Sequence, residues 1–205
     1  MTFTLIGDKN YRECMRINAA QIERLHPDAK IVIGDLGGNS DWPYPVIDLS
    51  GQTHREAFMM MKPLLLASLY YGEGGVLLMD GDTILLKPFD LEDALCHAIV
   101  TNRQSRHGRL NSGVVFCNDQ MFAIHWLKNG IKRMAKGNLH TEQLCEQWAL
   151  IDTVDQGKFT VKEVPCDIYN YSNVSAGIPD DVRIVHLKSG RYKDTKTMQM
   201  IKDRL

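Results

Sequence analysis

Two aspartates separated by one glycine follow a short apolar segment near the middle of the sequence. The segment Val76–Met79 comes after two glycines, which is typical of a buried strand preceded by a turn. Asp80 and Asp82 follow it directly, and Gly81 keeps the backbone between them adaptable. If the chain stays extended, the two carboxylates lie on one side, roughly 7 Å apart. Two anions that close repel each other unless a cation lies between them, so the pair predicts a divalent cation site.

The same triplet is also compatible with a purely structural turn. An Asp-Gly pair flanked by Met79 and Ile84 is typical of a β-hairpin, in which neither acid needs a ligand. An Asp-x-Asp triplet by itself does not separate the two interpretations.

Two basic residues elsewhere could serve such a site. Lys62 lies in an otherwise apolar helical stretch, residues 53–71, where a lysine either snorkels to the surface or reaches an anionic ligand; the helix alone favours snorkelling. His186 ends a predicted strand and precedes Gly190 and Lys193. Imidazole, glycine and lysine in this order suit a metal beside phosphates, although a surface histidine before a turn is the commoner explanation.

Alternating strands and helices must position these residues. The hydrophobic pattern predicts strands at 3–7, 31–33, 46–49, 76–79, 98–101, 111–118, 160–164 and 183–186, and helices at 11–25, 53–71, 90–95, 120–136 and 141–153. The helix at 141–153 carries Leu144, Trp148 and Ile151 on its core face, and Glu146 and Gln147 fall off that stripe. This order predicts parallel strand pairs, with ligands at the carboxyl ends of the strands.

Further polar candidates lie at predicted strand ends. Asp8, Asn10 and Tyr11 follow the first strand and could line a pocket, or they are a helix cap and ordinary turn residues. The basic loop 102–110 could lie across a phosphate or an acceptor. Asn111 stands at the open end of the strand that follows this loop.

Composition indicates one α/β domain, residues 1–205. The chain is 44% hydrophobic, and a formal net charge of −1 gives no footprint for a nucleic acid partner. Five widely spaced cysteines without a Cys-x-x-Cys pair favour reduced thiols and a cytoplasmic location. The apolar run at the N-terminus is too short for a signal peptide, and stable membrane insertion is not expected.

Taken together, these groups resemble a known family. The ordered set is Gly7-Asp8-Lys9-Asn10-Tyr11, His26-Pro27-Asp28, Asp80-Gly81-Asp82, Asn111-Ser112-Gly113-Val114, Glu146-Gln147, and His186 with Gly190 and Lys193. It resembles the GT-A glycosyltransferases, and most of all the retaining galactosyl- and glucosyltransferases of glycosyltransferase family eight. The resemblance covers nearly the whole chain in the right order.

The resemblance implies a single GT-A (Rossmann-like) domain with a central, mostly parallel sheet flanked by helices. It implies that Asp8, Asn10 and Tyr11 bind the uridine of a UDP-sugar, and that Asp80, Asp82 and His186 ligate Mn²⁺, with Mg²⁺ as a possible substitute. It also implies that Lys62 and Asp80 lie at the donor, and that Gly190 and Lys193 bind its diphosphate. Asn111 would bind the sugar or acceptor, and Gln147 would lie on the β face of the sugar. One departure is that three residues, not two, separate His186 from Gly190, and Asp194 follows Lys193.

The implied reaction transfers a hexose from UDP-glucose or UDP-galactose to a glycan, glycoprotein or lipid-linked acceptor, with retention of configuration. Gln147 is an amide and a poor nucleophile, so front-face attack by the acceptor is favoured over double displacement. Glu146 is the neighbouring carboxylate that would permit the other route.

Two alternatives come from different classes of protein. Asp80-Gly81-Asp82-Thr83 together with Asp180-Asp181 is similar to motifs of haloacid-dehalogenase-like phosphohydrolases. That family places Gly-Thr after its second aspartate and sets the loop on an early strand, so the spacing here disfavours it. The other alternative is a non-catalytic nucleotide-binding protein of the GT-A fold.

Overall fold

The structure is a computed structural model, and it describes residues 1–38, 41–51, 60–69, 71, 74–91, 96–102, 108–136, 145–188, 190 and 194–205. Seven of the described strands form one sheet in the order β3-β2-β1-β4-β7-β6-β8. They are β1 (Thr2–Gly7), β2 (Lys30–Asp35), β3 (Val46–Asp48), β4 (Val76–Asp80), β6 (Ala98–Asn102), β7 (Leu110–Cys117) and β8 (Val161–Pro165). Within this sheet β7 alone runs opposite to the others, which confirms the predicted α/β architecture with a mostly parallel sheet.

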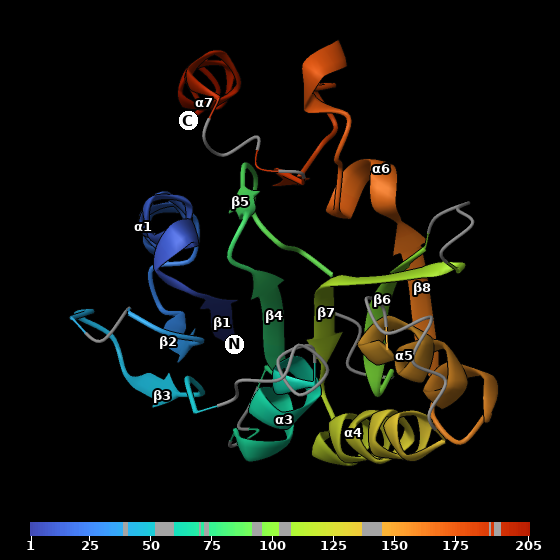
Figure 1. Ribbon diagram of the computed structural model, residues 1–205. Coiled ribbons are helices and arrows are strands. Elements are labelled where there is room, and N and C mark those ends of the chain that lie inside the picture. Colours follow the sequence, from blue (N-terminus) through green and yellow to red (C-terminus); the bar gives the residue numbers. More distant parts are fainter. Residues whose placement is uncertain are drawn as a thin grey trace.

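Helices cover both faces of this sheet (Figure 1). The longer ones are α1 (Arg12–Leu25), α3 (Met61–Ser68), α4 (Gln120–Ala135), α5 (Cys145–Asp155) and α7 (Thr195–Lys202), and the short ones are η1 (Lys9–Tyr11), α6 (Cys166–Tyr169) and η3 (Val174–Ala176). Leu77 and Met79 of β4 pack in the cluster that contains α1, whereas Val76 and Leu78 pack in the cluster of α3, α4 and α5. Successive strand residues point to opposite faces, so burial on both faces explains the unbroken apolar run.

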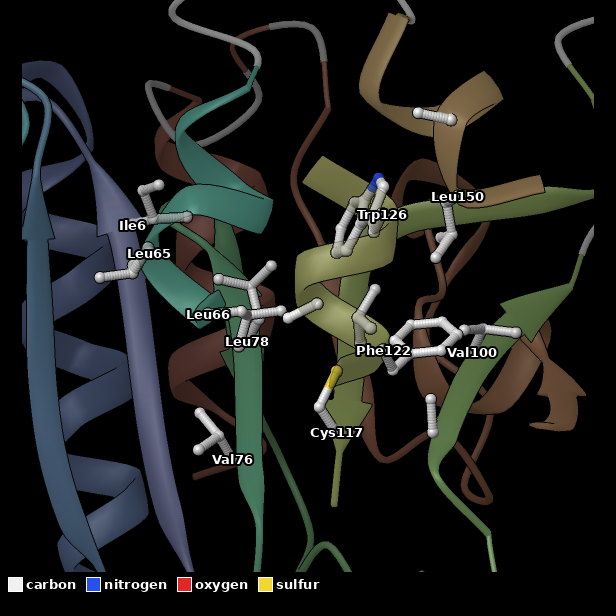
Figure 2. Close-up of a cluster of buried hydrophobic side chains, with 14 of the residues drawn as sticks. Ile6, Leu65, Leu66, Val76, Leu78, Val100, Cys117, Phe122, Trp126 and Leu150 are labelled. Carbon is white, nitrogen blue, oxygen red and sulfur yellow. The ribbon is translucent and has the colours of Figure 1, made fainter. Parts of the chain in front are cut away.

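The core between the sheet and α3, α4 and α5 is shown in Figure 2. Trp126 and Phe122 of α4 are fully buried beside Leu66 of α3 and Leu150 of α5. Pro63 lies in the first turn of α3, where its missing N–H costs no intrahelical hydrogen bond. This packing fixes α3 and α5 against the strands that carry the polar candidates.

A separate pair of strands lies beyond the end of β4 (Figure 1). β5 (Thr83–Leu85) and β9 (Ile184–His186) pair antiparallel, with Thr83 opposite His186. Ile84, Val185 and Met198 of α7 share one buried cluster, which holds this pair against α1 and α7. Because β4 and β5 belong to different sheets, the hairpin interpretation of the Asp-Gly pair is wrong.

The predicted core face of α5 is right for Ile151, which is buried, and Trp148 packs against the same core, but the prediction left two buried residues out. Glu146 and Gln147 are each about 2% exposed, whereas Trp148 is only partly buried. The helix packs against α4 and β7, and Glu146 accepts a hydrogen bond from Ser112 of β7 instead of facing water. Leu144, residues 92–95 of the predicted helix at 90–95, and most of the basic loop, residues 103–107, lie outside the described residues.

All five cysteines are reduced in the described structure, and four of them are buried. No helix in the described parts of the chain is both long and apolar enough to cross a membrane.

Candidate active site

The ends of three neighbouring strands bring the polar candidates together. β1 and β4 are parallel with Ile6 opposite Asp80, so both strands end at the same edge of the sheet. β7 runs the other way beside β4, and its first residues, including Asn111, therefore lie at that edge. The direction of β7 explains why a residue at the start of one strand can serve a site at the end of another.

Gly81 is required at this edge by close packing. A Cβ atom added to Gly81 would lie 2.9 Å from the Cβ of Tyr11 and 3.0 Å from the backbone oxygen of Ile6. No side chain fits there without displacing β1, so the glycine allows the acid-bearing turn to pass close to the end of the neighbouring strand. The backbone turns at Gly81 and Asp82 instead of continuing as an extended strand.

Asp80, Asp82 and His186 converge at the start of this turn. One ligand atom from each lies within 4.8 Å of the others. His186 Nε2 is 3.1 Å from Asp82 Oδ1 and 3.9 Å from Asp80 Oδ2. His186 is buried, so the surface-histidine interpretation is wrong. The opposed pair Thr83 and His186 in the β5–β9 ladder explains how residues so distant in sequence come together.

Lys62 reaches the acids instead of the surface, so the snorkelling prediction is wrong. Its Nζ lies 2.8 Å from Asp80 Oδ1 and 3.7 Å from Glu146 Oε1. Ser112 donates a 3.0 Å hydrogen bond to the same Glu146 oxygen. The buried lysine is tolerated here because Asp80 at the sheet edge and Glu146 of α5 supply two carboxylates that offset its desolvation.

Burial and charge act in opposite directions on this cluster. Burial alone would lower the pKa of Lys62, but Asp80 and Glu146 raise it above its ordinary value, so the lysine is charged. Burial raises the pKa of Glu146, although Lys62 and Ser112 act against this shift. Burial would also raise the pKa of Asp82, and the neighbouring His186 reverses this and lowers it.

A pocket opens in front of these residues. Its walls are Ile6, Gly7, Tyr11, Leu36, Lys62, Asp80, Gly81, Asp82 and His186. Tyr11 therefore shares one pocket with the three converging side chains. Asp8 accepts hydrogen bonds from the backbone and side chain of Asn10, which shows the capping interaction that the sequence left open. Neither Asp8 nor Asn10 is among the walls of this pocket.

Of the remaining predicted site residues, the three that the structure describes are not among the walls of this pocket. Asn111 and Gln147 are buried. Gly190 adopts a left-handed backbone with φ of 76°, which favours glycine. Lys193 lies outside the described residues.

Asn170 is a polar residue of this region that the sequence analysis missed. It follows the short helix α6, is about 2% exposed, and its side chain contacts Asn111, Thr101 and His186. Asparagine after a helical turn is ordinary, and only the placement of α6 beside β6 and β9 reveals its position.

The fold is that of GT-A nucleotide-sugar glycosyltransferases. No protein-family model matches the chain, and comparison with curated proteins finds no match. Solved structures do match: a glycosyltransferase involved in glycosylation of the major capsid of PBCV-1 has a TM-score of 0.67 at 13% identity, with 100% of this chain and 98% of that chain covered.

Two further glycosyltransferases share the fold. Galactosyltransferase LgtC, solved with donor and acceptor sugar analogs, has a TM-score of 0.58 at 15% identity, with 99% of this chain and 96% of that one covered. Glycosyltransferase GlyE of Streptococcus pneumoniae TIGR4 has a TM-score of 0.60 at 17% identity, with coverage of 90% and 53%. These matches confirm the fold that the sequence resemblance implied.

Proposed function

We propose that this chain is a glycosyltransferase that moves a hexose from UDP-glucose or UDP-galactose to a hydroxyl group of a glycan, glycoprotein or lipid-linked acceptor. The observation that carries the proposal is the convergence of Asp80, Asp82 and His186 in a pocket shared with Tyr11. It is supported by the fold, which the chain shares with a galactosyltransferase solved with donor and acceptor sugar analogs.

The three converging side chains fit a divalent cation. Adjacent ligand atoms of an octahedral cation with bonds near 2.1 Å lie about 3 Å apart and opposite ones about 4.2 Å apart. The separations of 3.1 Å and 3.9 Å from His186 Nε2 fall in this range. Two carboxylates and one imidazole suit Mn²⁺, with Mg²⁺ as the weaker substitute. A cation held there would neutralise negative charge on the leaving diphosphate.

The other residues of the chain would bind and orient the donor. Tyr11 offers an aromatic face for the uracil, with Asp8 and Asn10 beside it for base and ribose. Lys62 provides a fixed positive charge next to Asp80, where the donor sugar and its phosphate meet. Asn111 would hydrogen-bond the sugar or acceptor, and Gly190 and Lys193 would bind the diphosphate.

Front-face attack remains the preferred route to retention. The acceptor hydroxyl would bond to the sugar carbon as the bond to UDP breaks, and its proton would pass to the departing phosphate oxygen. Gln147 cannot form a stable glycosyl ester, and Glu146 is held by Ser112 and Lys62. A sugar adduct trapped on Glu146, together with loss of all activity in Glu146→Gln, would overturn front-face attack.

The test is hydrolysis of UDP-glucose and UDP-galactose without an acceptor, because slow release of UDP reports a competent donor site. Release that requires Mn²⁺, and that is abolished in Asp82→Asn, is the expected result. Asp119→Asn, which alters a helix-capping aspartate outside the pocket, is the matched control and should hydrolyse normally. Cleavage of an aryl phosphate without UDP-sugar turnover would favour the phosphohydrolase instead, and no turnover of either would favour a non-catalytic binding protein.

A further inference from the structure

A buried hydrogen-bond chain runs from the start of β7 to His186, and backbone groups fix its polarity. The backbone N–H of Gly113 lies 2.8 Å from Asn111 Oδ1. An N–H group can only donate, so the atom of Asn111 at this place is its oxygen. The two ends of the Asn111 amide are therefore assigned by the chain itself.

The same reasoning assigns the amide of Asn170. Its Nδ2 lies 2.9 Å from Asn111 Oδ1 and 3.2 Å from Thr101 Oγ1. The Thr101 hydroxyl donates to the backbone oxygen of Asn111 at 3.1 Å, which can only accept. Two acceptors thus face one end of the Asn170 side chain, and that end must be the NH₂ group.

The other end of Asn170 is then an oxygen that faces the histidine. Asn170 Oδ1 lies 2.7 Å from His186 Nδ1, so Nδ1 must carry a proton and donate it. In the neutral ring this leaves the lone pair on Nε2, the nitrogen 3.1 Å from Asp82 Oδ1. A metal-binding histidine needs that tautomer.

We propose that Asn170 is a positioning residue that selects the metal-binding tautomer of His186. This inference rests on the cation site of the proposed function. It adds a residue that is not among the walls of the pocket and that bonds to one of the candidate cation ligands, His186. Close packing also restrains the ring, because a Cβ on Gly113 would lie 2.6 Å from His186 Cε1 and 2.8 Å from Nδ1.

The network also orients Asn111. Its oxygen accepts from both Gly113 and Asn170, so the NH₂ group is the end that remains for a substrate oxygen. The Gly113 backbone therefore sets the orientation of Asn111 and, through Asn170, that of the histidine, because reversal of Asn170 would place its oxygen against Asn111 Oδ1.

The experiment measures Mn²⁺ affinity of the full chain without nucleotide, from the electron paramagnetic resonance signal of free Mn²⁺. Asn170→Leu keeps the side-chain shape but offers no acceptor to Nδ1, and should weaken binding about 10- to 100-fold, as losses of such partners do. Asn170→Asp keeps the acceptor for Nδ1 but loses the NH₂ group that donates to Asn111, so it should lose less affinity than Asn170→Leu. Asn129→Leu removes another buried asparagine, which donates to Thr153, and should leave affinity unchanged.

Each outcome decides the matter. Wild-type affinity in Asn170→Leu, or equal losses in Asn170→Leu and Asn170→Asp, would overturn the positioning role while the proposed function stands. A wild-type chain that binds no Mn²⁺ would overturn both. If Asn170→Leu does not fold, ¹⁵N spectra of the Mg²⁺-loaded wild type decide: a proton on Nδ1 alone is expected, and one on Nε2, alone or with Nδ1, would overturn the role.

Discussion

Lys62 neutralises the largely buried carboxylates beside the sheet edge. It is the cation between Asp80 and Glu146, and all three side chains are largely shielded from water. Removal of one partner from a buried ionic cluster leaves uncompensated charge, which is more costly than the cluster itself is favourable.

Replacement of Lys62 by methionine should therefore destabilise the protein strongly. Because Asp80 and Glu146 would lose their counter-charge, we expect the free energy of unfolding to fall by about 3–5 kcal/mol. Urea denaturation measures this change. Lys128→Met on the exposed surface of α4 is the matched control and should change stability by no more than about 0.5 kcal/mol. Equal stability of the two variants would contradict this account of Lys62.

Glu146 gives the protein a pH dependence with a definite sign. Burial raises the pKa of its carboxyl group, so the folded chain binds this proton more tightly than the unfolded chain does. The free energy of unfolding contributed by Glu146 is therefore greatest below its ordinary pKa of 4.5 and falls as pH rises through the raised value.

Glu146→Gln removes this titration, so its stability relative to wild type should increase as pH rises from 5 to 7.5. Urea denaturation across that range measures the difference. Glu163→Gln, which alters a carboxylate on β8 that pairs with Arg109, controls for the change in net charge. A relative stability that stays flat or falls with pH would contradict the raised pKa.

At the scale of elements, α4 depends on its cap as well as on its buried face. Asp119 accepts a 2.8 Å hydrogen bond from the backbone N–H of Met121, which satisfies one of the unpaired donors at the start of the helix. Asp119→Ala should lower the free energy of unfolding by about 1 kcal/mol, whereas Asp119→Asn keeps an acceptor and should cost less. Thermal denaturation compares the two, and equal losses would mean that the cap hydrogen bond contributes nothing.

The elements were predictable where one chemical pattern dominates. The unbroken apolar residues 76–79 predicted β4 correctly because a strand buried on both faces has no polar alternation. The buried face of α5 was predictable for Ile151 but not for Glu146 and Gln147, which are polar and nevertheless buried. Hydrophobic periodicity predicts that only apolar residues are buried. It therefore misses the buried polar residues of a functional site.

The candidate site was predictable in part for the same reason. Asp80 and Asp82 stand together in the sequence, and the family resemblance connected them to His186. Asn170 gave no such signal, because its role comes from the placement of α6 beside β9. Whether Lys62 reaches the acids or the surface likewise depends on the distance between a helix and a strand end. No local sequence pattern specifies that distance.

At the scale of the whole molecule, the cation site predicts linkage between ligand and stability. A ligand that binds only the folded chain at about 100 times its dissociation constant adds about 2.7 kcal/mol to the free energy of unfolding. For a chain of this length that corresponds to a rise of roughly 5–11 °C in melting temperature. Thermal denaturation with and without Mn²⁺ should show this rise in wild type and none in His186→Asn. An equal rise in both would place the stabilising ion elsewhere.

The β5–β9 ladder determines how late in synthesis the candidate cation site can form. The acids precede β5, and the imidazole that completes their cluster ends β9, about a hundred positions later in the chain. A ribosome must therefore release the chain beyond residue 186 before the three side chains can meet. Until then, the growing chain exposes two carboxylates without their imidazole partner, and the complete set of cation ligands does not exist.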